Sequence, residues 1–215
     1  AHYSLSVAEE IFKVYLSRVA KGAKDDNIVL PEDIVGKIPE EKSLEQVMKE
    51  LEGFIGMESV KKAIREIAKD IAAAKEREQL GLGPAEKMGI HIVLTGNPGT
   101  GKTTVARILA QIYKALGILE RGHLIECDRQ SLVGGYVGQT AIKTAEIIER
   151  AMGGVLFIDE AYSLTEGGQS DFGKEAIEII LKRMEDRRGD FIVIAAGYTD
   201  NMKRFIESNP GLKSR

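Results

Sequence analysis

The sequence predicts an α/β fold, a parallel sheet covered by helices on both faces. From residue 89 onward, short apolar segments alternate with stretches of helical periodicity. Strands that are apolar on both sides are typical of a parallel sheet buried between helices. The expected strands are Ile90–Thr95, His123–Cys127, Val155–Asp159 and Phe191–Ala196, and the expected helices are Lys102–Leu116, Gln139–Met152 and Lys174–Asp186.

The first fifty residues differ in texture from the rest. We expect residues 1–50 to form an N-terminal helical extension with a connector, and residues 51–215 to form a nucleotide-binding domain. Ser43 and Gln46 match a capping box that opens a short helix ending at Leu51. Apolar residues at helical spacing predict one helix near the N-terminus and another before Gly81; they are Ala8, Phe12, Tyr15, Leu16 and Val19, then Val60, Ile64, Ile67 and Ile71.

Composition limits the class of protein. The chain has 215 residues, of which 43% are hydrophobic and 29% charged, which is typical of a globular protein. No apolar stretch is as long as a membrane span, and the N-terminus lacks a signal-peptide core, so we expect a cytoplasmic protein. The single cysteine, Cys127, is expected in the core. A net charge of −3 gives no overall electrostatic signature of nucleic-acid binding.

The segment from Gly96 to Thr104 predicts a site for a nucleoside triphosphate. It matches the phosphate-loop pattern G-x-x-x-x-G-K-[ST] and lies between an expected strand and an expected helix. Glycines let successive backbone N–H groups point at phosphate oxygens, at the positive end of the helix dipole. Lys102 would contact the β- and γ-phosphates, and the Thr103 hydroxyl would bind Mg²⁺. The alternative is a glycine-rich turn without a ligand. The residues expected to bind nucleotide are Asn97, Pro98, Gly99, Thr100, Gly101, Lys102, Thr103 and Thr104.

Two carboxylates follow the apolar run Val155–Ile158, at the strand end where α/β sheets bind ligands. Asp159 is suited to orient Mg²⁺, and Glu160 is suited to polarise the water that attacks the γ-phosphate. An acid next to the metal ligand favours hydrolysis by water over transfer to a hydroxyl substrate. The alternative is a solvated strand end.

These motifs resemble those of the AAA+ ATPases. The phosphate loop, the segment from Phe157 to Ala161 and the closing segment from Asn209 to Arg215 carry the resemblance, which covers about residues 43–215. Within the family, the chain is most similar to the group that contains the red-type Rubisco activase CbbX and stage V sporulation protein K. The resemblance implies an ATPase that uses ATP and Mg²⁺.

The resemblance also implies an adenine contact and a pore loop. Ile55 and Gly56 match the segment that packs on adenine; the alternative is an ordinary helix-capping turn with a buried isoleucine. Tyr136, Val137 and Gly138 resemble the loop that lines the central pore of AAA+ rings, where an exposed aromatic side chain can grip a peptide without reading its sequence. The alternative is a tyrosine packed beneath a loop.

Three further residues are implied by position. Arg215 ends a segment that resembles the one carrying the arginine finger, which a neighbouring subunit would use. Tyr198 and Thr199 follow the last expected strand, where relatives place the residue that senses the γ-phosphate. Many relatives have Asn there, and this chain does not.

The resemblance therefore implies a homo-oligomeric ring, hexameric by analogy, that pulls on a polypeptide client. We expect neither a membrane nor a nucleic acid as its partner. Two alternatives remain: a nucleic-acid motor or clamp-loader relative, and a nucleotide-gated scaffold that scarcely hydrolyses ATP. The family's last strand and C-terminal helical lid are not found before residue 215. We thus expect part of a longer protein, in which the strand Ile90–Thr95 has an open edge.

Overall fold

The computed structural model describes residues 42–54, 56–81, 91–136, 138–167 and 172–214. Several predictions concern residues outside these ranges. They are the N-terminal extension up to residue 41, the adenine contact Ile55, the pore-loop residue Val137 and the arginine finger Arg215.

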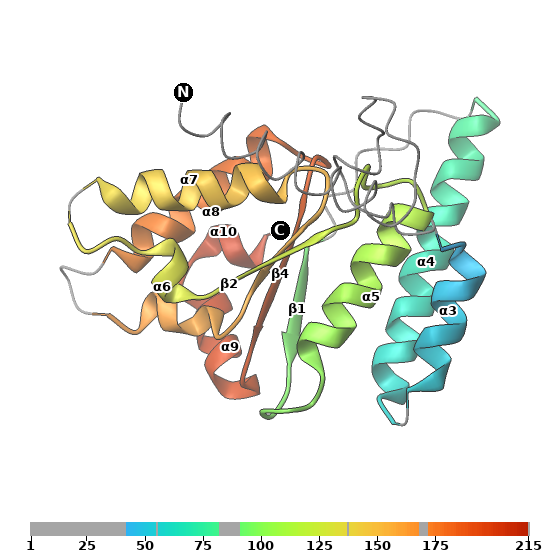
Figure 1. Cartoon of the computed structure of the whole chain (residues 1–215), viewed down its shortest axis with the longest axis horizontal. Coiled ribbons are helices and arrows are strands. Elements are labelled where there is room, and N and C mark those ends of the chain that lie inside the picture. The colour runs from blue at the N-terminus through green and yellow to red at the C-terminus, as the bar shows by residue number, and fades with distance from the viewer. Residues whose placement is uncertain (1–41, 55, 82–90, 137, 168–171, 215) are drawn as a thin grey trace, which may run out of the picture. The chain divides into compact units, whose positions relative to one another are not determined.

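A four-stranded parallel sheet forms the centre of the fold (Figure 1). Its spatial order is β1-β4-β3-β2, and every neighbouring pair is parallel. The parallel sheet predicted from the apolar segments is therefore confirmed. The strands are β1 (Ile92–Thr95), β2 (Leu124–Cys127), β3 (Val155–Ile158) and β4 (Ile192–Gly197).

Helices cover both faces of this sheet (Figure 1). One layer contains the helix that follows the phosphate loop, and the other contains the helices that follow β2, β3 and β4. The first layer contains α3 (Leu44–Gly53), α4 (Glu58–Gln79) and α5 (Lys102–Ala115). The second contains α6 (Arg129–Leu132), α7 (Gln139–Ala151), the 3₁₀ helix η1 (Ala161–Thr165), α8 (Gly173–Asp186), α9 (Thr199–Glu207) and α10 (Pro210–Lys213).

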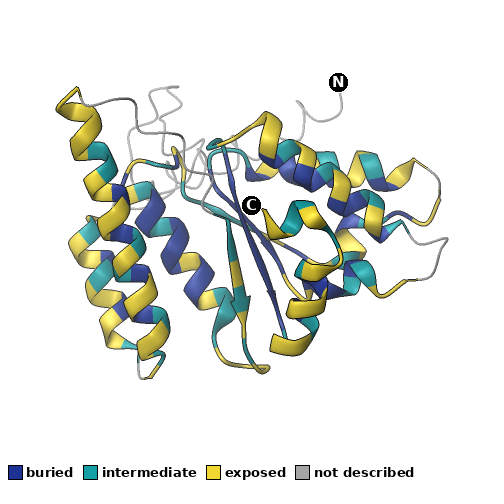
Figure 2. Ribbon diagram, turned by 180° about the vertical axis from the view of Figure 1, so that it is seen from behind, coloured by how far each residue is buried: buried dark blue, intermediate teal, exposed yellow. Residues whose placement is uncertain are grey.

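The central strands explain why two separate hydrophobic cores exist. Successive side chains of a strand point to opposite faces. In β3, Val155 and Phe157 join the core with α5, whereas Leu156 and Ile158 join the core with α7 and α8. Both central strands, β3 and β4, are buried along their whole length (Figure 2). In this arrangement the carboxyl ends of β1, β3 and β4 come to one edge of the sheet.

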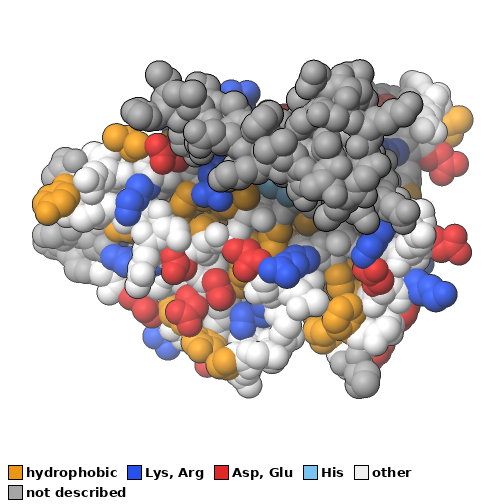
Figure 3. Space-filling view, viewed as in Figure 1, with side chains coloured by type: hydrophobic (Ala, Val, Ile, Leu, Met, Phe, Trp, Pro, Cys, Tyr) orange, Lys and Arg blue, Asp and Glu red, His pale blue; other side chains and the backbone are white. Residues whose placement is uncertain are grey.

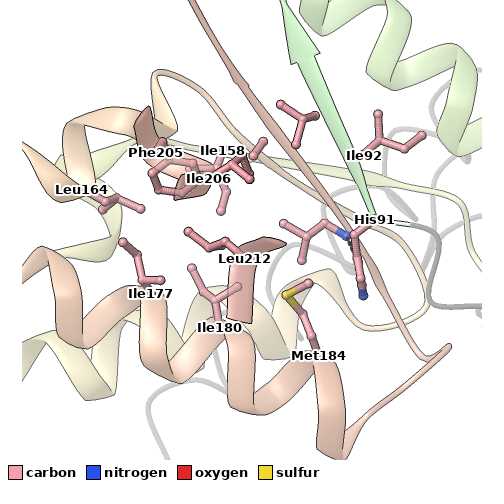
Figure 4. Close-up of a pocket in the computed structure, with 13 residues that line it drawn as sticks. His91, Ile92, Ile158, Leu164, Ile177, Ile180, Met184, Phe205, Ile206 and Leu212 are labelled. Atoms are coloured by element: carbon pink, nitrogen blue, oxygen red, sulfur yellow. Dashed lines mark hydrogen bonds between the residues drawn. The ribbon is translucent and has the colours of Figure 1, made fainter. Parts of the chain in front are cut away.

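Strand β1 differs from the central strands because it pairs with β4 alone among the described residues. Its side chains alternate between half-buried and exposed, and Val93 is 43% exposed. An apolar groove lies beside it (Figure 4), where Ile177, Ile180 and Leu212 point toward a common space. At the rim of the groove, His91 Nδ1 accepts a hydrogen bond of 3.0 Å from the Val193 N–H.

The capping box predicted at Ser43 is present. The Ser43 hydroxyl accepts from the Gln46 N–H at 3.3 Å, and the Gln46 side chain accepts from the Ser43 N–H at 2.8 Å. The helix that it opens, α3, continues through residue 50, and its Val47 and Leu51 are buried in the core shared with α5. The division of the chain at residue 50 stays a prediction, and α3 itself spans that position.

Small differences from the expected boundaries have local causes. The strand expected to reach Asp159 ends at Ile158, because Glu160 turns the backbone into the left-handed region with φ 47°. His123 precedes β2 rather than starting it, although its carbonyl accepts from the Val155 N–H at 2.8 Å. Phe191 forms only an isolated bridge with Arg188 before β4 begins.

Cys127 is buried, as expected for a core residue. Burial, with the nearby charge of Asp128 as a smaller cause, raises the pKa of its thiol to about 12. Because the thiolate is the reactive form of cysteine, this side chain is poorly suited to nucleophilic chemistry.

Candidate nucleotide-binding site

The phosphate loop joins β1 to α5 through two glycines in the left-handed region. Gly99 has φ 72°, and Gly101, the N-cap of α5, has φ 79°. Side chains rarely tolerate this conformation, so the glycines of the motif are required by the backbone. The Thr100 hydroxyl donates to the Asn97 carbonyl at 2.8 Å, which closes the loop on itself. The loop thus presents the N-terminus of a 14-residue helix to a ligand.

Lys102 is held at the loop by two backbone carbonyls. Its Nζ donates to the Gly96 carbonyl and to the Asn97 carbonyl, each at 3.1 Å. An ammonium group has three N–H donors, so one donor remains for a phosphate oxygen. The predicted phosphate contact stays a prediction.

The two predicted carboxylates are exposed at the carboxyl end of β3. Asp159 Oδ1 accepts from the Glu160 N–H at 3.0 Å, which fixes the orientation of the aspartate. Glu160 has φ 47° and ψ 44°, and Met57 is the only other described non-glycine residue with a positive φ. Such strain persists where the surrounding structure imposes it, and it is concentrated at functional sites.

The side chains of Asp159 and Thr103 are of the types that suit magnesium. Asp159 offers a carboxylate, and Thr103, in the first turn of α5, offers a hydroxyl. Among the described residues, no group of three or more His, Cys, Asp or Glu side chains could hold a metal ion. Mg²⁺ suits such a sparse site, because it keeps several waters and is bound by one or two carboxylates together with substrate phosphates.

Tyr198 lies close to the phosphate loop. Its ring centroid is 5.9 Å from Lys102 Nζ. Its ring also packs on Tyr162, with centroids 5.8 Å apart. Sequence reasoning missed Tyr162, although its place two residues after Glu160 was a usable signal. Burial, with a contribution from the Glu160 charge, raises the pKa of Tyr162 to about 12.

The predicted adenine side has an unusual backbone. Gly56 has φ 81° and Met57 has φ 59°, so the chain makes a left-handed turn before α4. Met57 is the N-cap of α4 and makes no capping hydrogen bond with its side chain. A small cavity lies beside this turn; the residues that line it are Leu51, Phe54, Met57, Val60, Lys61, Thr104, Val105 and Ile108.

Lys61 was not identified from the sequence. It is 4% exposed, and its Nζ donates to the Glu58 carboxylate at 3.1 Å and to the Glu52 carbonyl at 3.4 Å. A lysine at an internal position of a predicted amphipathic helix gives no sign of burial, because the cation can usually reach water. Its burial depends on the tertiary contact between α3 and α4.

The predicted pore loop lies between α6 and α7, and Tyr136 in it is 75% exposed. The alternative of a tyrosine packed beneath the loop is therefore wrong. Two fully buried threonines fasten the base of the loop. The Gly134 N–H donates to the Thr140 hydroxyl at 2.9 Å, and the Thr144 hydroxyl donates to the Leu132 carbonyl at 3.1 Å.

Some predicted residues are brought together and others are not. The phosphate loop, Lys102 and Tyr198 form one cluster. Thr199 is exposed at the start of α9. The segment before Arg215 forms the short helix α10, in which the Asn209 side chain accepts from the Gly211 N–H at 2.8 Å.

The described surface carries mixed charge. On the face in Figure 3, Lys and Arg side chains are interspersed with Asp and Glu side chains. Several of these form exposed ion pairs, such as Arg65 with Glu52 at 2.6 Å. Within the described part of the chain, no helix has the length and apolar character needed to cross a membrane.

Comparison with known proteins places this geometry in context. The family described as "ATPase family associated with various cellular activities (AAA)" matches residues 92–211, more than half of the chain. Stage V sporulation protein K of Bacillus subtilis is 48% identical over 172 residues, which are 80% of this chain and 53% of that protein. Protein CfxQ of Xanthobacter flavus is 52% identical over 183 residues, or 84% of this chain and 57% of that protein.

Two further relatives are each 50% identical to this chain. The chloroplastic ribulose bisphosphate carboxylase/oxygenase activase of Cyanidioschyzon merolae is 50% identical over 174 residues, covering 80% of this chain and 59% of that protein. Protein CbbX of Cereibacter sphaeroides is 50% identical over 172 residues, covering 79% of this chain and 55% of that protein. The chain spans between half and three fifths of the length of these relatives.

Proposed function

The chain belongs to the AAA family of ATPases, and from this premise we propose that it uses ATP hydrolysis to remodel a partner polypeptide in a ring of identical subunits. The family expected from the sequence motifs is confirmed by the match, and ATP hydrolysis by this chain is part of the proposal. The observation that carries the proposal further is the exposed Tyr136 on a fastened loop, in a chain that also contains Lys102, Asp159 and Glu160.

The proposed hydrolysis uses four side chains of this chain. Lys102, with one N–H donor left, binds the β- and γ-phosphates. Asp159 and the Thr103 hydroxyl hold Mg²⁺, which supplies charge stabilisation when bound. Glu160 accepts a proton from the attacking water as the water adds to the γ-phosphate. ADP and phosphate leave, and the proton returns to solvent.

The proposed adenine contacts are Ile55 and Gly56. Gly56 supports this role for two reasons. Its φ of 81° places it in a left-handed turn, and because it has no side chain, the backbone there is open to close approach by a base. Phe54 and Met57 add apolar surface to the adjacent cavity. An aromatic base that packs on this segment would gain mainly from contact with these apolar side chains.

The proposed client is a polypeptide that Tyr136, Val137 and Gly138 contact in the central pore. An exposed aromatic ring grips apolar side chains without a fixed hydrogen-bond pattern, so it suits clients of varied sequence. The name of one relative states that it is an activase of ribulose bisphosphate carboxylase/oxygenase, which is an action on another protein. We therefore favour a polypeptide client over a small molecule.

We propose a hexameric ring in the cytoplasm, with Arg215 serving the nucleotide of the neighbouring subunit. A guanidinium can stabilise the charge that develops on the transferred phosphoryl group. A nucleic-acid motor is the second candidate. The intermingled charges on the described surface and the absence of a basic side chain at the Tyr136 position give it less support.

A mixing experiment tests the ring and the arginine together. Arg215→Ala and Glu160→Gln subunits are each expected to be nearly inactive alone. Mixed rings should regain part of the ATPase activity, because some interfaces then join an intact arginine to an intact glutamate. If mixed rings form, as shown by mass, and stay as inactive as either variant, the role of Arg215 in a neighbour's site is wrong. Stimulation by DNA but by no polypeptide would favour the nucleic-acid motor.

A further inference from the structure

The Tyr198 ring and two loop carbonyls surround the phosphate-loop lysine. The ring centroid lies 5.9 Å from Lys102 Nζ, close to the limit of about 6 Å within which an aromatic face attracts a cation. The same Nζ donates to the carbonyls of Gly96 and Asn97. These contacts restrict an otherwise flexible four-carbon side chain before any nucleotide binds.

The position of Tyr198 depends on Tyr162. The two rings are tilted by 36° with centroids 5.8 Å apart, a separation at which aromatic pairs attract. Tyr162 is itself only 8% exposed. It fits against the end of β4 because position 197 is glycine: a Cβ there would lie 2.7 Å from Tyr162 Cδ1 and 2.8 Å from Met202 Sδ. The packing of Tyr162 therefore requires the absence of a side chain at Gly197.

We propose that Tyr198 is a positioning residue for Lys102, and that Tyr162 holds the Tyr198 ring in place. This inference rests on the proposed function, because it assumes that Lys102 binds the phosphates. A lysine already held at the loop loses less side-chain freedom when the triphosphate binds, so its contact with the phosphates is stronger. The aromatic face performs this role, and the tyrosine hydroxyl is not needed for it.

The family position suggests a competing role, in which the Tyr198 hydroxyl senses the γ-phosphate directly. The two roles differ in the atom that matters. Positioning depends on the ring beside the ammonium, whereas sensing depends on the hydroxyl. Tyr198→Phe keeps the ring and removes the hydroxyl, and Tyr198→Leu removes both while keeping an apolar side chain.

The test measures the dissociation constant of ATP with Mg²⁺ by titration calorimetry on the 215-residue chain. Tyr198→Leu is expected to weaken ATP binding about two- to five-fold, the range of an exposed cation–π contact. Tyr198→Phe is expected to bind ATP as tightly as the parent chain. Equal losses in both variants would assign the effect to the hydroxyl, and no loss in either would overturn the proposal.

A double-mutant cycle locates the effect on the lysine. In a Lys102→Met background, Tyr198→Leu should cause no further loss, because the cation that the ring positions is absent. An equal loss in that background would mean that Tyr198 acts elsewhere in the site. If Lys102→Met itself leaves ATP binding unchanged, the proposed phosphate role of the lysine fails. If Lys102→Met weakens binding and Tyr198→Leu does not, only the positioning role fails.

Variants of Tyr162 provide an independent test of the supporting role. Tyr162→Phe keeps the ring and should preserve ATP affinity, whereas Tyr162→Leu should lower it in the same direction as Tyr198→Leu. Because Tyr162 is buried, melting temperatures are compared for both variants. A Tyr162→Leu chain that melts cooperatively and binds ATP like the parent would contradict the supporting role, and the Tyr198 variants would still test the main proposal.

Discussion

The proposed nucleotide site and the Tyr136 loop differ in which part of the chain is held in place. At the nucleotide site the backbone is bent into uncommon conformations, with positive φ at Gly99, Gly101 and Glu160. At the loop, the tip side chain of Tyr136 is 75% exposed, and the hydrogen bonds lie beneath it at two buried threonines. At the proposed nucleotide site, the bent backbone itself carries the groups proposed to react. At the Tyr136 loop, only the base is held by hydrogen bonds, and the Tyr136 side chain extends into solvent.

This difference follows from what each region would bind. Hydrolysis of a phosphate bond depends on donors and acceptors held in place before the reaction, because reorganising them costs part of the rate. Gripping polypeptides of varied sequence depends on apolar contact, which needs no fixed pattern of donors. Substitutions at the first region should therefore change binding or turnover, and substitutions at the second should change the response to a client.

The largest expected effect is at Glu160. Glu160→Gln should keep ATP affinity and lower the turnover rate by roughly two to four orders of magnitude, because the amide cannot accept the proton of the attacking water. Steady-state phosphate release and an ATP-binding titration measure the two quantities separately. Glu166→Gln is the matched control, since Glu166 is an exposed carboxylate nearby that accepts a hydrogen bond from Asn201 at 3.2 Å.

Lys102→Ala should show the complementary behaviour, with weakened ATP binding as its first effect. If Glu160→Gln hydrolyses ATP at the parent rate, Glu160 is not the base. A similar loss of turnover in Glu166→Gln would mean that the general negative charge of this surface matters, rather than the geometry at the end of β3.

The second effect concerns coupling to a client. Tyr136→Ala should abolish the stimulation of ATPase activity by an unfolded polypeptide such as reduced carboxymethylated lactalbumin. Its melting temperature should change little, because substitutions at exposed positions are usually within about 0.5 kcal/mol of neutral. Ile142→Ala is the matched control, since Ile142 is 62% exposed one turn into α7. Stimulation lost in Ile142→Ala and kept in Tyr136→Ala would place the client on α7 instead.

Much of the nucleotide site could be predicted from the sequence because its chemistry depends on consecutive residues. The phosphate loop is one continuous segment, and Asp159 and Glu160 directly follow an apolar strand. A parallel sheet brings the carboxyl ends of its strands to one edge, so both motifs are expected at that edge. The same reasoning gave all four strands, with differences of one or two residues at their ends.

The contacts that sequence reasoning missed all depend on tertiary packing. The Tyr162 ring packs on Tyr198 from a different element, in space left by Gly197. Lys61 is buried, and its Nζ donates to the Glu52 carbonyl of α3, a different helix. Thr140 and Thr144 lie at ordinary positions of an amphipathic helix, and their hydroxyls find partners in the preceding loop. A spacing rule for helices or strands contains no information on such partners.

The smallest expected effect is at the base of the Tyr136 loop. Thr140→Val removes the acceptor of the Gly134 N–H and leaves a buried donor without a partner, which costs about 1–3 kcal/mol. Thr140→Ser keeps the hydroxyl and should lose much less. Urea unfolding of both variants measures the difference. Because the loop base is loosened while the tip is unchanged, Thr140→Val should also reduce, without abolishing, the stimulation by lactalbumin.

This last variant discriminates between two explanations of the loop. If the tip acts by apolar contact alone, the loosened base in Thr140→Val leaves stimulation at the parent level. If the fastened base transmits force from α7 to the tip, stimulation falls in Thr140→Val and returns in Thr140→Ser. Thr144→Val, which leaves the Leu132 carbonyl without its 3.1 Å donor, should repeat the result from the other anchor. If Thr140→Val and Thr144→Val give the same result, the effect belongs to the loop base as a whole and not to a local defect at Gly134.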